Sequence, residues 1–504
     1  MTARRFQNPV LPGFYPDPSV CRVGADYYLV TSSFEYFPGV PIFTSQDLVS
    51  WRQIGHCLTR ESQLALAGVK ASQGIFAPTL RFHAGTFYLV TTNISGGGNF
   101  FVTTRDPAGP WSDPVWLKES AWGMDPSLCF DDDGRAYFTR HGGGEQGGIY
   151  QAEVDLGRGA LLGEAQLIWS GTGGIWPEGP HLYRRGDYYY LLIAEGGTGY
   201  DHSVTVARAR SPWGPFEPCP RNPILTHRAR PEHPIQATGH ADLVDDAEGR
   251  SFCVFLGIRP SGGRYHHLGR ETFLASVDWD PAGWPSIRGD AGVELELESP
   301  SELSPVGART ALRDDFVGPA LGFAWNFVRN PPPGSWSLSE RPSFLRLHGA
   351  PGSLDDLAPK AFVGRRQQHF RCTVSTLLEF EPEGAQEAGL CVRANEENHY
   401  DLFVTSDDAG RAIVLRARRL AQTETVLCMP IGPGAIELTI QAQASSYEFF
   451  WSQRGVPRSL GSLPTRALST EIAGGFTGVY FAMYALGASA LADFDWFDYV
   501  PSAE

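Results

Sequence analysis

Three acidic residues that each open a strand-like segment are the side chains of this sequence best suited to chemistry. Asp17 precedes Pro-Ser-Val, Asp125 precedes Pro-Ser-Leu, and Glu178 precedes Gly-Pro-His-Leu. Carboxyl groups gathered in one site resist joint ionisation, so such a set can supply an acid and a base together. A local explanation competes with this one, because an aspartate before a proline commonly caps a turn. The chemical interpretation therefore requires a fold that brings the three together.

A strand hairpin that recurs through the first part of the chain predicts that fold. Each copy turns at a glycine and continues in aromatic and β-branched residues, which is typical of strands. The turn glycines are Gly24, Gly85, Gly134, Gly186 and Gly249. They lie about 50–60 residues apart, which is the length of a four-stranded blade. The repeat predicts an all-β, five-bladed β-propeller.

The strand before each turn indicates where a site should form. The innermost strand of every blade lines the central channel of a propeller. Alignment of the repeats gives equivalent positions to Asp17, Ala77, Asp125, Glu178 and His240. Turn capping does not explain three acids at one repeated position. We therefore expect an acidic site at one mouth of the channel.

The residue pattern of the sequence changes after the repeat. Residues 294–305 combine alternation with Pro and Ser and are expected to form an exit strand and a linker. Segments 372–380 and 436–443 then alternate with period two, as half-buried strands do. We predict a propeller domain over residues 1–300 and an accessory β-sandwich over residues 314–504.

Composition limits the partners. The formal net charge of the 504 residues is −15, which disfavours nucleic acid and anionic membranes and suits a neutral ligand. No apolar run is long enough to span a membrane, and the first residues lack the apolar core of a secretory signal. The eight cysteines are scattered without metal-ligand spacing. We expect a reduced, cytoplasmic protein, which could form a homo-oligomer.

Several stretches of the propeller half resemble glycoside hydrolase family 43, in its β-xylosidase/α-L-arabinofuranosidase branch. The matching segments are residues 13–19, 33–43, 123–127, 177–183 and 269–274. The resemblance implies an inverting glycosidase in which Asp17 is the general base, Glu178 the general acid, and Asp125 a modulator of the acid. An inverting pair needs a gap of roughly 6.5–9.5 Å for a water molecule, which blades facing each other across a channel can provide.

The resemblance also implies substrate-binding residues. Arg270 matches a sugar-binding arginine, although a structural salt bridge is the alternative. Phe34 matches an aromatic residue beside the terminal sugar, and Phe76 stands where the family usually has tryptophan. Trp176 either lines the same pocket or packs in the core. Phe476, on a segment resembling a sandwich loop that reaches the propeller mouth, either closes the pocket or belongs to the sandwich core.

No cofactor is expected, although calcium could bind at two places. In some relatives the counterpart of His240 lies on the channel axis near water or calcium, but hydrogen bonding inside the channel is the favoured interpretation. In the second domain, the acidic segments 314–316 and 493–498 could hold calcium, or could be ordinary solvated turns.

The expected activity is the release of terminal xylose or arabinose from short xylo- or arabino-oligosaccharides. We favour a β-D-xylosidase, with an α-L-arabinofuranosidase as the alternative, because a pocket separates such similar sugars by few contacts. Two alternatives are not enzymes. A carbohydrate-binding propeller should have lost at least one of the three acids, and a purely structural propeller predicts a neutral channel.

Overall fold

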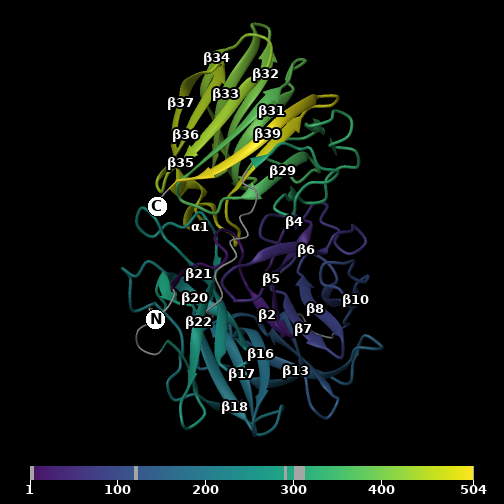
Figure 1. Ribbon diagram of the computed structural model, residues 1–504, viewed down its shortest axis with the longest axis vertical. Coiled ribbons are helices and arrows are strands. Elements are labelled where there is room, and N and C mark those ends of the chain that lie inside the picture. The colour runs from purple at the N-terminus through teal and green to yellow at the C-terminus, as the bar shows by residue number, and fades with distance from the viewer. Residues whose placement is uncertain (1–4, 119–122, 289–291, 300–312, 503–504) are drawn as a thin grey trace.

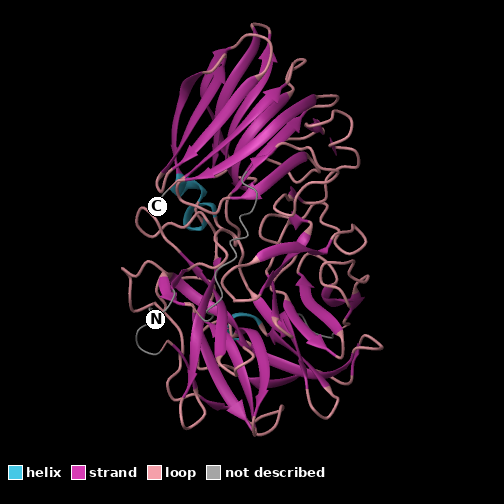
Figure 2. Ribbon diagram, viewed as in Figure 1, coloured by secondary structure: helices cyan, strands magenta, loops and turns pink. Residues whose placement is uncertain are grey.

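The computed structural model describes residues 5–118, 123–288, 292–299 and 313–502. Two lobes built almost wholly of strands lie one above the other, with the N-terminal half of the chain below and the C-terminal part above (Figures 1 and 2). The helices of the described part are short: η1 (Gly144–Gln146), η3 (Thr465–Leu468) and α1 (Thr470–Ala473). Within the described residues, no helix is long and apolar enough to cross a membrane.

The lower lobe is the predicted five-bladed propeller. Blade one contains β2 (Ser19–Val23), β3 (Asp26–Val30), β5 (Gly39–Ser45) and β6 (Arg52–Leu58). Blade two contains β7 (Thr79–His83), β8 (Thr86–Asn93), β9 (Gly98–Thr104) and β10 (Val115–Trp116). Blade three contains β11 (Gly123–Phe130), β12 (Ala136–Gly142), β13 (Gly148–Asp155), β14 (Ala160–Leu161) and β15 (Gln166–Trp169).

The remaining two blades follow the same order. Blade four contains β16 (Glu178–Arg185), β17 (Tyr188–Glu195), β18 (Ser203–Ala209) and β19 (Glu217–Pro218). Blade five contains β20 (Gln236–Asp245), β21 (Ser251–Ile258), β22 (Glu271–Trp279) and β23 (Pro285–Ile287). The five turn glycines all have a positive φ, and an added Cβ would meet nothing within 4 Å at any of them. The left-handed conformation, rather than a lack of space, therefore favours glycine at these turns.

The two ends of the propeller domain pair with each other in a small sheet outside the blades. Strand β1 (Arg5–Gln7) pairs antiparallel with β24 (Glu296–Glu298), which lies within the expected exit segment. Asn8 then fastens the entering chain to blade five, because its side chain donates to the Leu274 carbonyl and accepts from the Leu274 N–H, each at 3.0 Å. The expected linker beyond β24 lies largely outside the described residues.

A buried aspartate ties four blades together inside the channel. Asp242 of blade five accepts hydrogen bonds from Ser19 Oγ of blade one at 2.6 Å and from Tyr183 Oη of blade four at 2.5 Å. Arg81 of blade two adds an ion pair at 2.8 Å. Side chains of the innermost strands thus fix the blades around the axis.

The upper lobe is the predicted β-sandwich. One sheet contains β25 (Arg313–Asp314), β27 (Trp336–Ser337), β28 (Leu345–His348), β30 (Cys372–Glu379), β35 (Ile436–Ala442), β36 (Ser446–Gln453), β37 (Val456–Pro464) and β39 (Leu491–Pro501). The other contains β29 (Ala361–Arg366), β31 (Glu387–Asn395), β32 (Asn398–Asp407), β33 (Gly410–Arg419), β34 (Gln422–Pro430) and β38 (Tyr480–Leu486). Every second residue of β30 and β35 is buried, as the alternation predicted.

The two lobes share backbone pairing and a hydrophobic core. Strand β4 (Tyr36–Phe37) of the propeller pairs with β26 (Phe327–Val328) of the second domain. The rings of Tyr36 and Tyr480 stack at a centroid distance of 3.9 Å. The sandwich is thus docked on blade one by a continuous interface and can contribute to a site there.

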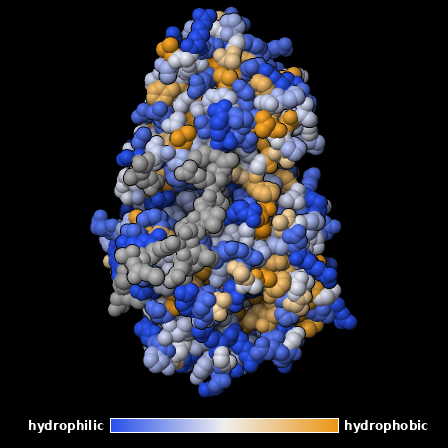
Figure 3. Space-filling model, in the orientation of Figure 1, coloured by the Kyte–Doolittle hydropathy of each residue, from blue (hydrophilic) through white to orange (hydrophobic). Residues whose placement is uncertain are grey.

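The face of the molecule in Figure 3 is largely hydrophilic, with apolar residues in small groups.

Candidate active site

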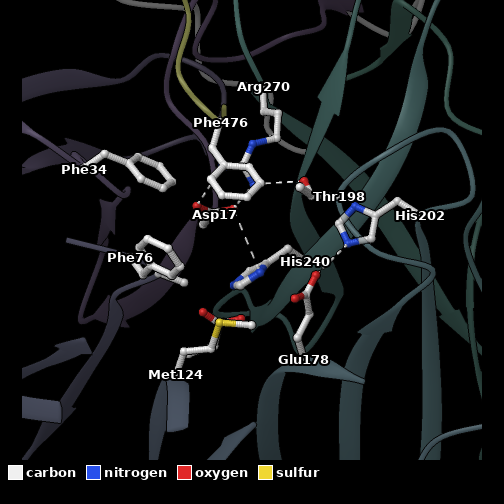
Figure 4. A pocket seen from close by; sticks show the side chains of 12 residues that line it. Asp17, Phe34, Phe76, Met124, Glu178, Thr198, His202, His240, Arg270 and Phe476 are labelled. Carbon is white, nitrogen blue, oxygen red and sulfur yellow. Dashed lines mark hydrogen bonds and ion pairs between the residues drawn. The ribbon is translucent and has the colours of Figure 1, made fainter. Parts of the chain in front are cut away.

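A pocket with about 430 Å³ of empty space collects residues from all five blades and one from the sandwich (Figure 4). Its lining residues are Asp17, Phe34, Phe76, Ala77, Met124, Asp125, Glu178, Thr198, His202, His240, Arg270 and Phe476. All three acids therefore line the same pocket.

A bulge that recurs in the innermost strands aims side chains into the pocket. In β11, β16 and β20 the pairing register shifts at this point. The residue in the left-handed conformation is Asp125 (φ 53°), Gly179 (φ 56°) and His240 (φ 47°), respectively, and Asp17 just before β2 has φ 55°. Such left-handed residues are uncommon outside glycine and recur where backbone strain is part of a functional site.

This register corrects one part of the sequence alignment. The residue equivalent to Asp17 in blade four is Gly179, and Glu178 stands one residue earlier. Its structural equivalents are Met124 and Gly239, because all three pair across the innermost hairpin just before the bulge. The error arose because the alignment matched acid with acid. The Gly-Pro dipeptide of blade four is the equivalent of the Asp-Pro dipeptides of blades one and three. Glu178 nevertheless reaches the same pocket.

Asp17 is a buried carboxylate held by a cation and a hydroxyl. Arg270 Nη1 donates to its Oδ1 at 2.7 Å, and Ser32 Oγ donates to its Oδ2 at 2.5 Å. Burial alone would raise the pKa of Asp17, but the Arg270 charge, followed by His240 and Ser32, outweighs it. The pKa of Asp17 is therefore below its ordinary value, and the group is ionised at neutral pH.

Glu178 lies in the opposite electrostatic setting. Burial is the largest influence on its pKa, and the negative charges of Asp125 and Asp17 add to it. The Arg270 charge opposes them, yet the pKa of Glu178 is raised well above its ordinary value. A carboxyl in such surroundings keeps its proton and can act as an acid.

Asp125 lies between these extremes. The pKa of Asp125 is raised above its ordinary value. Burial is the largest cause of the increase, His240 lowers the pKa, and the charge of Asp17 raises it further. Its Oδ2 accepts a hydrogen bond from the Gly179 N–H at 3.2 Å. Because Gly179 directly follows Glu178, this bond fixes the backbone that carries the acid.

Three phenylalanines and an arginine form one side of the pocket. Phe34 lies 5.3 Å from Phe76 and 6.0 Å from Phe476 between ring centroids. The Arg270 guanidinium lies 5.7 Å from the ring centroids of both Phe34 and Phe476. Apolar ring faces beside a polar group of this kind suit the two faces of a sugar.

Phe476 is the contribution of the sandwich, between α1 and β38. Its side chain is 38% exposed, so it belongs to the pocket rather than to the sandwich core. Its backbone N–H donates to Ser72 Oγ of the propeller at 2.7 Å. The structure thus brings Phe476 to the propeller mouth, one of the two alternatives that the sequence left open.

The predicted site residues other than Trp176 line the pocket. Trp176 is half-buried, its ring faces His141 at a centroid distance of 5.5 Å, and it is absent from the lining. Sequence reasoning missed Met124, Thr198 and His202. Thr198 and His202 lie in loop 196–202 of blade four, outside the aligned strands, so the repeat gave no signal for them.

The residues at the two suggested calcium positions contact different kinds of protein groups. Asp314 accepts hydrogen bonds from the Phe316 N–H and from Trp325 Nε1, and Asp493 forms ion pairs with Arg341 and Arg346. His240 instead packs beside Asp17, with Nδ1 4.0 Å from Oδ1. Within the described part of the chain, no group of three or more His, Cys, Asp or Glu side chains could hold a metal ion.

An acidic, aromatic-walled pocket at the mouth of a propeller defines a class of glycosidases, and sequence comparison places the chain within it. Residues 6–285 match the model for glycosyl hydrolases family 43, and residues 313–500 match the beta xylosidase C-terminal Concanavalin A-like domain. The chain belongs to glycosyl hydrolases family 43. Members of this family act without a cofactor.

Three relatives cover nearly the whole chain. A non-reducing end alpha-L-arabinofuranosidase of Bacteroides ovatus is 45% identical over 99% of this chain and 95% of its own length. A xylosidase/arabinosidase of Butyrivibrio fibrisolvens is 41% identical over 96% of each chain. The crystal structure of a xylan beta-1,4-xylosidase from Bacillus halodurans superposes with a TM-score of 0.92 at 37% identity, over 98% of this chain and 100% of that one. The protein is therefore a glycosidase that acts on oligosaccharides.

Proposed function

We propose that this glycosidase is an exo-acting, inverting enzyme that removes a terminal pentose, arabinose or xylose, from short oligosaccharides. The observation that carries the proposal is the opposite protonation of two carboxyls in one pocket. The pKa of Asp17 is lowered, whereas that of Glu178 is raised well above its ordinary value. Two carboxyls whose surroundings separate their pKa values are suited to act as base and acid at the same pH.

In the proposed reaction, both carboxyls act in a single displacement. Asp17 accepts a proton from a water molecule as the water oxygen attacks the anomeric carbon. Glu178 donates its proton to the glycosidic oxygen as the bond from that oxygen to the anomeric carbon breaks. The sugar leaves with inverted configuration, and the aglycone leaves with a hydroxyl. Asp125 keeps Glu178 protonated through its charge and positions it through the Gly179 N–H.

Arg270 has two parts in this proposal. Its ion pair with Asp17 keeps the base ionised, and its Nη1 also donates to Thr198 Oγ1 at 3.1 Å. One N–H of Nη2 reaches Asp17 Oδ2 at 3.4 Å, and a sugar hydroxyl beside Phe34 and Phe476 could accept from its second N–H. The same side chain would thus link recognition of the terminal sugar to activation of the water.

The position of Phe476 supports exo action. Phe476, which belongs to the second domain, forms part of the wall of the pocket, and residues of the innermost strands form its floor. A pocket closed on one side by another domain admits the end of a chain more readily than its middle. This arrangement favours release of one unit at a time from the non-reducing end.

The identity of the pentose is supported from two sides. The Bacteroides ovatus relative is named an alpha-L-arabinofuranosidase, and several relatives at 35–37% identity are named xylosidases. We propose α-L-arabinofuranosidase as the leading activity because the more similar relative carries that name, with β-D-xylosidase as the second candidate. This order reverses the preference drawn from sequence alone.

One experiment tests substrate and stereochemistry together. The protein is incubated with xylobiose and, separately, with an arabino-oligosaccharide, and the first-formed anomer of the released sugar is followed by proton NMR. Faster release of arabinose, with inversion at the anomeric carbon, is expected. Faster release of xylose would select the second candidate, and retained configuration would overturn the single-displacement mechanism.

A further inference from the structure

His202 is a pocket residue that the proposed mechanism has not used. It ends loop 196–202, between β17 and β18, and its side chain is 1% exposed. Neither ring nitrogen makes a well-formed hydrogen bond within the described residues, where the backbone of Ala237 is the hydrogen-bonding group that influences the ring. A buried polar side chain normally has a partner, and a group without one in an active site requires an explanation.

The ring of His202 is aimed at Glu178. Its Nε2 lies 3.7 Å from Glu178 Oε1, and Figure 4 shows the two side chains facing each other at one side of the pocket. A shift of less than an ångström would bring these atoms within hydrogen-bond distance. Such catalytic hydrogen bonds are often long in an unliganded enzyme and shorten when substrate binds.

Glycine at position 239 makes room for this ring. A Cβ on Gly239 would lie 2.4 Å from Cε1 and Nδ1 of His202, a distance that no side chain could tolerate. Gly239 is also the position in blade five that is equivalent to Glu178 in blade four. The innermost strand of one blade thus leaves a gap that the loop of its neighbour fills with an imidazole.

His202 is held in its neutral form. Burial lowers its pKa to about 3, and electrostatic interactions with His240 and Arg270 act in the same direction, whereas a hydrogen bond with the Ala237 backbone opposes them. A protonated imidazole beside Glu178 would favour the ionised carboxylate and lower the pKa of the acid. A neutral imidazole can form a hydrogen bond to the carboxyl without removing the proton that the reaction needs.

From these observations we propose that His202 is the positioning residue of the acid: its Nε2–H donates a hydrogen bond to Oε1 of Glu178, which leaves the acidic proton on Oε2 and directs it at the glycosidic oxygen. The inference rests on the proposed role of Glu178 as the proton donor. It adds a residue that acts through the acid and does not itself exchange a proton with the substrate.

Substrates that differ only in their leaving group test this role. A dinitrophenyl pentoside has a leaving group that departs without protonation, whereas a disaccharide needs the acid. In His202→Leu, we expect kcat on the disaccharide to fall about 10- to 100-fold, a part of the usual contribution of general acid catalysis. The kcat on the dinitrophenyl pentoside should fall less than about threefold, and KM should change little on either substrate, since only the acid step is affected.

Two further variants separate positioning from packing. His202→Gln places an amide nitrogen near the site of Nε2 and should restore part of the lost kcat on the disaccharide. Gly239→Ala should displace the ring and reproduce the selective loss seen in His202→Leu. Circular dichroism and inhibition by the free pentose, both measured on every variant, report whether the fold and the sugar pocket remain intact.

Each outcome bears on the inference. An equal loss on both substrates, or a rise in KM, would overturn it and assign His202 to sugar binding. Unchanged kcat on the disaccharide would overturn it as well. Glu178→Gln serves as the reference: if that variant also loses both substrates equally, the acid assignment itself fails. If Glu178→Gln is selective and His202→Leu is not, only the present inference fails.

Discussion

The two sides of the pocket contain the same functional group in opposite states. On one side, Asp17 accepts hydrogen bonds from Arg270 and Ser32, and its pKa is lowered. On the other, Glu178 has a neutral imidazole 3.7 Å away and two acids nearby, and its pKa is raised. Neighbouring charge separates their pKa values, because desolvation raises the pKa of both groups whereas the charges beside them act in opposite directions. The pair shows how a propeller can build an acid and a base from carboxyls by varying what each blade places beside them.

Removing either carboxyl should have the largest effect. Asp17→Asn and Glu178→Gln are each expected to lower kcat on a disaccharide about 10²–10⁴-fold, because each loses one proton transfer. Only Glu178→Gln should retain activity on a dinitrophenyl pentoside, because that substrate still needs the base. Steady-state kinetics on both substrates, with circular dichroism as the control for folding, checks this. Equal retention by both variants would contradict the division of roles.

Arg270→Met should have the second-largest effect, because it removes the cation that binds Asp17. A hydrogen bond to a charged group is worth about 2 kcal/mol, so kcat/KM should fall about 30-fold. Without the cation, the pKa of Asp17 should rise, because Arg270 is the strongest influence that lowers it. Since the base must be ionised, the acid limb of the pH profile of kcat/KM should move to higher pH. An unmoved acid limb would show that Arg270 does not set the state of Asp17.

Asp125→Asn should have a smaller effect, which comes from a change in the pKa of Glu178. Asparagine keeps an oxygen that can accept from the Gly179 N–H, but it removes a charge that raises the pKa of Glu178. The pKa of Glu178 should therefore fall, and the alkaline limb of the pH profile should move to lower pH. The acid limb should move in the same direction or stay in place. A shift of the alkaline limb to higher pH would exclude a charge effect of Asp125 on the acid.

Phe476→Ala should have the smallest effect on chemistry. It removes part of the aromatic wall, so we expect KM to rise up to about tenfold, in line with 1–1.5 kcal/mol of lost ring contact, while kcat changes little. The thermal stability should hardly change, because the side chain is 38% exposed. Tyr480→Ala is the matched comparison: that ring is fully buried between the lobes and its loss should cost about 3–5 kcal/mol of stability. A large loss of stability in Phe476→Ala would assign it to the domain interface.

The fold could be predicted because its signals are local and repeated. Turn glycines and period-two alternation lie within short windows, and five copies of one hairpin identify a propeller. The acids were found through the same repeat. The placement of Glu178 was one residue off, because a bulge shifts the register and sequence does not show which residue takes the left-handed conformation. The structure identified Gly179 there through its φ of 56°.

The residues that sequence reasoning missed depend on contacts between distant segments. His202 enters the pocket from a loop, and the gap beside Gly239 that accepts it exists only once two blades are packed together. Phe476 was singled out from the sequence with two alternatives left open, and the choice between them follows from the docking of the two lobes. Trp176 lies two residues before Glu178 but outside the pocket lining, which shows that proximity along the chain does not place a side chain at a site.

The protonation difference between the two sides is the central claim, and infrared difference spectroscopy measures it most directly. Spectra of the unliganded protein at neutral pH are compared with those of Glu178→Gln and Asp17→Asn. We predict that Glu178→Gln removes a band of a protonated carboxyl, whereas Asp17→Asn removes a band of an ionised carboxylate. Loss of a carboxylate band in Glu178→Gln would contradict the account.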